Sequence, residues 1–185
     1  MLRLMSKKTE FKPLKIKITL SPQLDKDEYI PKNALIDSWL NHAWQLIDSK
    51  NLKAFNNQYH RYNLDILITS ESSIQKLNLQ FRNQDKPTNV LSFPNLNFDN
   101  LETKNFELIN GDILGNLVFC PKLINREARS KYKKSQRAHW AHLLIHSFLH
   151  LLGYSHDNES DSQKMELMEV KILSELDFEN PYFYN

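Results

Sequence analysis

Residues 146–156, HSFLHLLGYSH, place three histidines at a spacing typical of metal ligands. Residues four apart lie on one face of a helix, so His146 and His150 can point toward the same ion. Gly153 offers a place for this helix to end, because glycine readily adopts the left-handed backbone conformation found after helix ends. That turn can bring His156 back toward the other two. Three neutral imidazoles with an open fourth position are typical of a catalytic zinc site.

A second ligand set needs weighing, because five of the seven histidines lie between His139 and His156. His142, His146 and His150 recur every four residues. However, His142 and His150 would be about 12 Å apart along a helix that rises 1.5 Å per residue. Zinc–nitrogen bonds are about 2.0–2.1 Å long, so one ion cannot easily take both. We therefore predict His146, His150 and His156 as the metal ligands, with His142 behind them or facing the substrate.

The spacing of these histidines also matches the metzincin peptidases, except at one position. Those enzymes have glutamate directly after the first histidine, where it serves as general base. Here that position is Ser147, which cannot do the same work near neutral pH. The metal ligands of this pattern are therefore present, but the general base needed for peptide hydrolysis is absent.

A structural zinc site is the other alternative. Such a site is normally closed by four protein ligands, often cysteines. Cys120 is the only cysteine and is distant in sequence, so we favour a catalytic site with an open position. A single cysteine also excludes an intrachain disulfide, which fits a reducing compartment.

Length and composition indicate one globular domain. The chain has 185 residues, of which 41% are hydrophobic and 25% charged, and this length suffices for a real core. No stretch approaches the roughly 18 apolar residues that cross a bilayer, so we expect no membrane association. We expect roughly ten residues at the N-terminus to be flexible and residues 94–111, which are polar and rich in asparagine, to form a surface loop.

The net charge of +2 hides a basic segment that leads into the histidines. Between residues 122 and 137 the only acid is Glu127. The basic residues of this segment are Lys122, Arg126, Arg129, Lys131, Lys133, Lys134 and Arg137. Such a segment suits a polyanionic partner, although on charge alone a solvated helix face is the better interpretation.

Hydrophobic periodicity predicts an α+β fold. Alternation over 14–20 and 62–69, and strand-like composition over 88–93 and 113–120, predict four strands. Helices are expected over 34–47, 70–81, 121–134 and 135–152, and a last one from Ser160 in a capping-box pattern. We therefore predict a single domain in which about five helices pack on a small mixed four-stranded sheet, with the metal site at the end of a helix.

A second informative stretch is LNLQFRNQDKPTNVLSF, residues 77–93. Its composition predicts the end of a helix, a basic turn and a strand. Arg82 and Lys86 could hold a phosphate group, with Arg82 offering a two-pronged guanidinium. On spacing alone, a solvated turn is the better interpretation.

Together, the two stretches closely resemble the YbeY family of bacterial endoribonucleases. The matching residues are Leu77-Asn78, Arg82, Asp85, 87–93, 141–143, 150–154, His146 and His156. The resemblance implies a zinc-dependent, single-strand-specific endoribonuclease of the cytoplasm. It implies roles in 16S ribosomal RNA 3′-end maturation and ribosome quality control. The implied partners are ribosomal RNA, the small ribosomal subunit and ribosome-assembly proteins.

The resemblance also implies roles for individual residues. His146, His150 and His156 would bind one zinc ion, and Arg82 would stabilise the reacting phosphate. The chain departs from the family at Asn116 and Ser155, where aspartate is usual, and neither change removes a ligand. Two other functions remain open: a metallopeptidase-like or other small-substrate metallohydrolase, and a non-catalytic ribosome-assembly factor with a structural zinc.

Overall fold

The structure is a computed structural model that describes residues 12–24, 27–47, 62–97, 107–108, 112–130 and 135–183. The N-terminal residues expected to be flexible, most of the expected loop over 94–111, and Lys131, Lys133 and Lys134 lie outside the described residues. No helix in the described ranges is long and apolar enough to cross a membrane.

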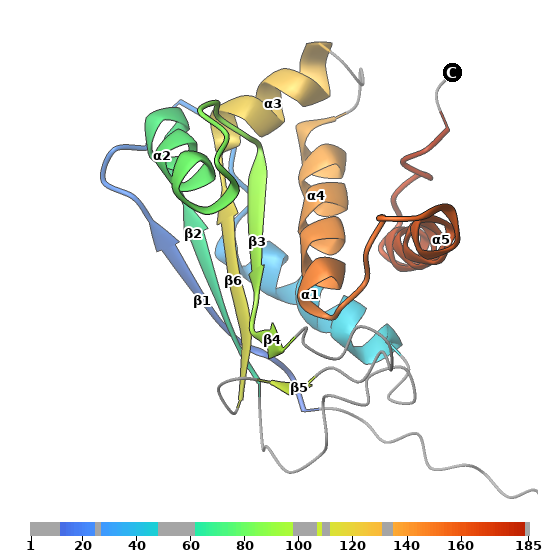
Figure 1. Ribbon diagram of the computed structural model, residues 1–185. Helices are drawn as coiled ribbons and strands as arrows, with labels where there is room; N and C mark the ends of the chain where they lie inside the picture. The colour runs from blue at the N-terminus through green and yellow to red at the C-terminus, as the bar shows by residue number, and fades with distance from the viewer. Residues whose placement is uncertain are drawn as a thin grey trace, which may run out of the picture.

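A four-stranded mixed sheet forms the framework (Figure 1). Its order is β1 (Lys15–Leu20), β2 (Asn63–Ile68), β6 (Ile113–Phe119) and β3 (Val90–Pro94). The pairs β1–β2 and β2–β6 are parallel, and β3 runs antiparallel to β6 at the edge. The predicted mixed sheet is therefore confirmed.

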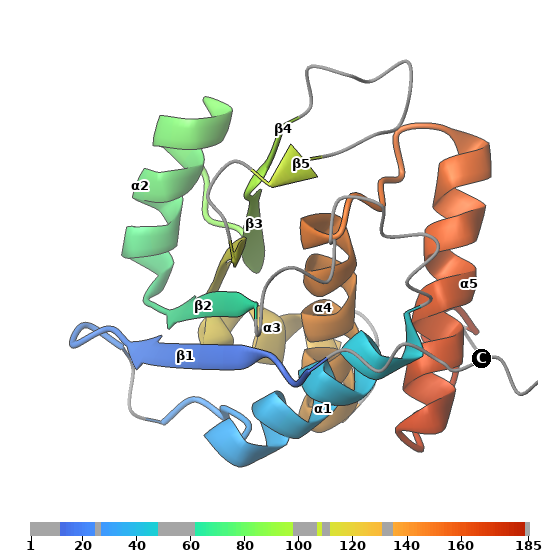
Figure 2. The same cartoon turned by 90° about the horizontal axis from the view of Figure 1, so that it is seen from below.

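Within the described ranges five helices accompany this sheet, in line with the sequence prediction. They are α1 (Asn33–Leu46), α2 (Glu71–Arg82), α3 (Pro121–Ser130), α4 (Gln136–Leu151) and α5 (Glu159–Glu175). Figure 2 shows α4 surrounded by the sheet, α1 and α5. This central place follows from its composition, because Trp140, Leu144 and Phe148 are fully buried and apolar side chains occupy most of its circumference.

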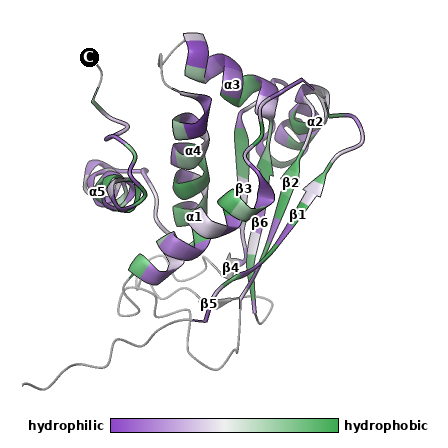
Figure 3. Cartoon of the chain, turned by 180° about the vertical axis from the view of Figure 1, so that it is seen from behind, coloured by the Kyte–Doolittle hydropathy of each residue, from purple (hydrophilic) through white to green (hydrophobic). Residues whose placement is uncertain are grey.

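The two faces of the sheet are covered by different helices. Along β6, Leu117 and Phe119 join the main core beneath α4. Val118 points the other way into a smaller cluster with Ile74 of α2 and Leu91 of β3. The alternation follows from the two-residue period of a strand, and Figure 3 shows hydrophobic residues along the strands and within α4. As a result, α2 and α4 lie on opposite faces of the sheet.

Gly115 fixes the start of β6 beside the end of α4. Its φ of +144° is disfavoured for other residues. A Cβ there would lie 2.3 Å from the carbonyl oxygen of Phe93 and 3.0 Å from Cδ2 of Leu151. Only glycine therefore lets strand β3 and helix α4 approach β6 so closely.

Two sequence predictions need correction, namely the loop over 94–111 and the start of the last helix. The expected loop over 94–111 contains strands β4 (Leu96–Asn97) and β5 (Glu107–Leu108), which pair antiparallel. Asn95 holds the entry to this ribbon, because its side-chain amide donates to the carbonyl of Ile113 at 2.8 Å.

The last helix begins earlier than predicted. Asn158, and not Ser160, caps α5, because its Oδ1 accepts from the backbone N–H of Asp161 at 3.0 Å. Asparagine and serine are comparable N-cap residues, so the pattern alone favoured the wrong one.

Candidate metal centre

The end of helix α4 brings the three predicted histidines together. His146 and His150 lie one turn apart near its C-terminus. Gly153 follows in the left-handed conformation with φ +86°, as predicted. The backbone N–H groups of Gly153 and Tyr154 then bond back to the carbonyls of His150 and Leu149, both at 3.1 Å. The chain reverses direction at this helix end, so that His156 lies against the end of α4.

The three rings converge on one point in space. The Nε2 atoms of His146 and His150 are 3.2 Å apart. The ring of His156 lies 5.7 Å from the ring of His146 and 5.0 Å from that of His150, measured between centroids. One nitrogen from each histidine lies within 4.8 Å of the others, so the group could hold a metal ion.

Hydrogen bonds at the far side of two rings support a cation between them. Nδ1 of His146 faces Oε1 of Glu169 at 2.8 Å, and Nδ1 of His150 faces the carbonyl of Tyr154 at 2.9 Å. Both partners are acceptors, so each Nδ1 must carry the proton. In the neutral rings the two facing Nε2 atoms then present lone pairs, which repel unless a cation lies between them. Two nitrogens bound tetrahedrally to one zinc would be about 3.3 Å apart, close to the observed separation.

His150 is held in the neutral form that a metal ligand needs. Burial is the main reason, and the neighbouring His146 adds to it; together they lower the pKa of His150 to about 4. A neutral imidazole keeps its lone pair available at neutral pH.

Glu169 of α5 is the central residue that the sequence interpretation missed. It is fully buried and accepts hydrogen bonds from His142 at 2.9 Å, from His146 at 2.8 Å and from the Tyr182 hydroxyl. Burial alone raises the pKa of this carboxyl, but the bonds from His142 and His146 outweigh it and lower the pKa to about 2. Glu169 is therefore a carboxylate that fixes the ring of His146.

A signal for Glu169 was present in the sequence. It follows Met165 by four residues and precedes Ile172 by three, so it lies on the apolar stripe of α5. A carboxylate on such a stripe is seldom buried without partners.

His142 lies behind the three proposed ligands, which is one of the two positions that the sequence allowed. It bonds to Glu169, and with His146 and Glu169 it forms a second group close enough to hold an ion. In that group, however, the facing atoms already form hydrogen bonds of 2.8 and 2.9 Å between donors and an acceptor. The first group is therefore the better metal centre.

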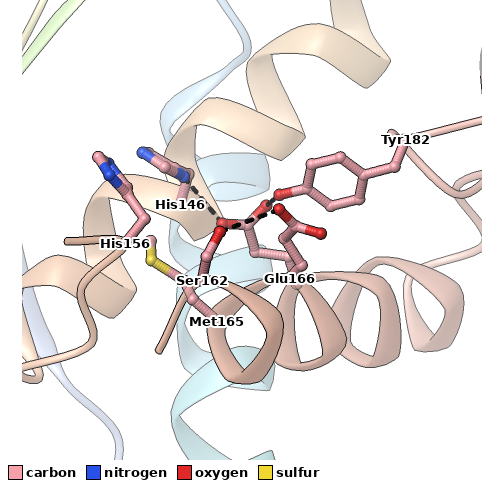
Figure 4. A pocket seen from close by; sticks show the side chains of 7 residues that line it. His146, His156, Ser162, Met165, Glu166 and Tyr182 are labelled. Carbon is pink, nitrogen blue, oxygen red and sulfur yellow. Dashed lines mark hydrogen bonds and ion pairs between the residues drawn. The ribbon is translucent and has the colours of Figure 1, made fainter. Parts of the chain in front are cut away.

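A cavity opens beside the histidines (Figure 4). Its walls come from α4, α5, the loop after α4 and the C-terminal segment. The lining residues are His146, His156, Ser162, Met165, Glu166, Glu169 and Tyr182. Since His156 is exposed, a ligand can reach the centre from solvent.

Ser147 excludes the peptidase mechanism at this site. The position that is glutamate in metzincins is fully buried here, and its hydroxyl donates to the carbonyl of Leu143 at 2.6 Å. The side chain therefore bonds to its own helix and cannot act as a base.

Arg82 is not brought into contact with the histidines. It is exposed at the last position of α2, and among the described residues no hydrogen bond or ion pair joins it to them. The turn after it is well held, because Asn83 adopts φ +54° and the side chain of Asn78 donates to the carbonyl of Lys86 at 2.7 Å.

Three residues of the basic segment noted in the sequence form an exposed face on α3. Lys122, Arg126 and Arg129 are exposed, whereas Leu123, Ile124 and Ala128 are buried. Lys122 forms an ion pair with Glu71 of α2 at 3.3 Å. Since α4 follows α3, this face lies toward the N-terminal end of α4, and the metal centre lies at the other end.

Comparisons with known proteins agree on one family. The family model described as endoribonuclease YbeY matches residues 24–177. The curated protein "Endoribonuclease YbeY" of Buchnera aphidicola subsp. Baizongia pistaciae is 35% identical over 91% of this chain and 98% of its own length. The protein of the same name from Coxiella burnetii is 38% identical over 84% of this chain and 91% of its own length.

The fold is also similar to that of a solved structure. The solution structure of TM1509 from Thermotoga maritima aligns with a TM-score of 0.50 and 24% identity, over 88% of this chain and 91% of that one. At this identity the likeness concerns the fold alone.

Proposed function

The chain belongs to the YbeY family of endoribonucleases, and from this premise we propose that it is a zinc-dependent endoribonuclease specific for single-stranded RNA. Its proposed task is 16S ribosomal RNA 3′-end maturation and ribosome quality control in the cytoplasm. Its partners would be the small ribosomal subunit and ribosome-assembly proteins. Residues 1–185 would form one metallo-endoribonuclease domain.

The observation that best supports a metal-dependent reaction is the separation of 3.2 Å between two facing imidazole nitrogens whose other nitrogens are already bonded. His146, His150 and His156 are the proposed ligands. Three neutral imidazoles suit zinc and leave one position open for water or substrate. Zinc bound there would lower the pKa of a bound water and polarise a phosphoryl oxygen.

The protein's own residues would prepare this reaction in three ways. Glu169 holds His146 in one tautomer and one orientation. Arg82, which is permanently charged, would stabilise negative charge on the reacting phosphate. The basic face of α3 (Lys122, Arg126 and Arg129) would bind the RNA backbone further along the strand.

The test compares the wild-type protein with Arg82→Ala and His150→Ala on single-stranded ribosomal RNA, with zinc content measured in each. We expect His150→Ala to lose both zinc and cleavage. Arg82→Ala should keep its zinc and cleave at least tenfold more slowly. If Arg82→Ala cleaves normally with zinc bound, the proposed role of Arg82 is wrong. If the zinc-loaded wild type cleaves no RNA, the non-catalytic assembly factor becomes the better function.

A further inference from the structure

Helix α2 presents a large aromatic ring to solvent next to Arg82. The side chain of Phe81 is 57% exposed, although burial of a phenylalanine side chain is favourable. Its ring meets that of Phe93 edge to face, with centroids 5.0 Å apart and planes at 69°. Phe93 in turn packs against the smaller core cluster of the sheet. The Phe81 ring therefore packs against Phe93 on one side and is otherwise largely open to solvent.

Two cations follow this ring closely in sequence, on a turn that is held by hydrogen bonds. Arg82 and Lys86 are both exposed. The nearby Asp85 bonds to the side-chain amide of Gln75 at 2.9 Å, and the carbonyl of Lys86 is held by Asn78. An exposed aromatic ring near positive charges is a combination that binds single-stranded nucleic acid, because bases stack on the ring and phosphates pair with the cations.

A short series of contacts connects this ring to the end of the histidine helix. Phe93 belongs to the edge strand β3, and its backbone lies against Gly115. The same side of Gly115 also approaches Leu151, the residue after His150. Helices α2 and α4 both contact β3, so this edge strand lies between Phe81 and the end of the histidine helix.

We infer that Phe81 is a base-stacking residue for the RNA substrate, next to the reacting phosphate proposed for Arg82, with Lys86 binding an adjoining phosphate. The inference rests on the proposed function and adds a nucleotide-binding position to it. The ring recognises the flat face that all four bases share, so it gives affinity for single strands without choosing a sequence. A base-paired strand cannot offer that face, which would explain a preference for single-stranded substrate.

The experiment measures binding of zinc-loaded protein to a short single-stranded RNA and to inorganic polyphosphate, which has the charge but no bases. Phe81→Leu retains an apolar side chain and removes the aromatic face. We expect it to weaken RNA binding by about 5- to 150-fold, the range for loss of one stacked base, and to leave polyphosphate binding unchanged. Phe81→Trp should bind RNA at least as tightly as the wild type. Arg82→Ala should weaken the binding of both RNA and polyphosphate.

Leu79→Ala serves as the matched control, because Leu79 is 45% exposed on the same helix. It should bind both ligands as the wild type does. The inference is overturned if Phe81→Leu binds RNA normally, or if it loses RNA and polyphosphate equally, which would indicate a disturbed turn. Normal RNA cleavage by the wild type together with normal binding by Phe81→Leu would remove this inference and leave the proposed function intact.

Discussion

At the scale of single residues, Glu169 explains why the histidines can form a defined site. A buried carboxylate is costly unless it is paired, and here three side chains donate to it. In return it fixes the proton of His146 on Nδ1, which directs the lone pair of Nε2 toward the other ligands. The C-terminal segment takes part, because Tyr182 bonds to the same carboxylate.

We predict that Glu169→Gln lowers zinc affinity by about 10- to 100-fold, the usual cost of losing a carboxylate partner of a histidine ligand. Competition with a zinc chelator measures this affinity directly. Glu166→Gln is the matched control, since Glu166 lines the same cavity from the same helix but is exposed. Equal affinities of Glu169→Gln and the wild type would show that Glu169 does not support the site.

The metal-free protein should lose stability in mild acid because of His150. Its pKa is about 4 in the folded protein, below the ordinary value of 6.5, so the unfolded chain binds this proton more readily. The free energy of unfolding should therefore fall as the pH decreases from 6.5 toward 4. Below pH 4.5 Glu169 should add to the loss, because its folded pKa is about 2.

Urea unfolding of chelator-treated protein at pH 7.5, 6 and 5 tests this dependence. His150→Gln, which cannot be protonated, should show a flatter response over the same range. A slope in His150→Gln as steep as that of the wild type would assign the acid sensitivity to other groups.

At the scale of elements, the site depends on how α4 ends. Its last two turns supply two histidines, and the left-handed Gly153 turns the chain so that the third one returns. The same helix is buried against the sheet, α1, α3 and α5, so its end has little freedom to move. The ligand positions are thereby set by packing that extends through the core.

Gly153→Ala should destabilise the protein by about 1–2 kcal/mol, the cost of a left-handed conformation for a residue with a Cβ. It should also weaken zinc binding, because the added Cβ would strain the turn that places His156. Thermal unfolding and chelator competition measure the two effects. Gly153→Asn is the control, since asparagine tolerates this conformation better, and its losses should be smaller. Identical behaviour of the alanine variant and the wild type would separate the turn from the metal centre.

At the scale of the whole molecule, the sequence predicts those helices and strands whose formation depends on neighbouring residues in the chain. Ser70 and Ser135 cap their helices, Pro121 begins α3, and the mixed sheet has the expected strands. The convergence of the histidines also follows from local rules, because the ligands lie within eleven residues, from His146 to His156.

What the sequence could not give depends on distant contacts. Glu169 reaches His146 across 23 residues, and its role becomes visible only when α5 packs on α4. The pairing of β4 with β5 joins residues on either side of a long connection. The placement of Arg82 likewise depends on α2 and α4 covering opposite faces of the sheet, which no local pattern specifies.

The central claim is that the three histidines hold the metal ion at which RNA is cut, and zinc titration tests it most directly. Metal-stripped protein receives increasing zinc, and cleavage of a single-stranded RNA is measured at each step. We predict no cleavage without metal, a rise that ends at one equivalent of zinc in the wild type, and none at that point in His146→Ala. Cleavage by the stripped protein, or an equal rise in His146→Ala, would contradict the claim.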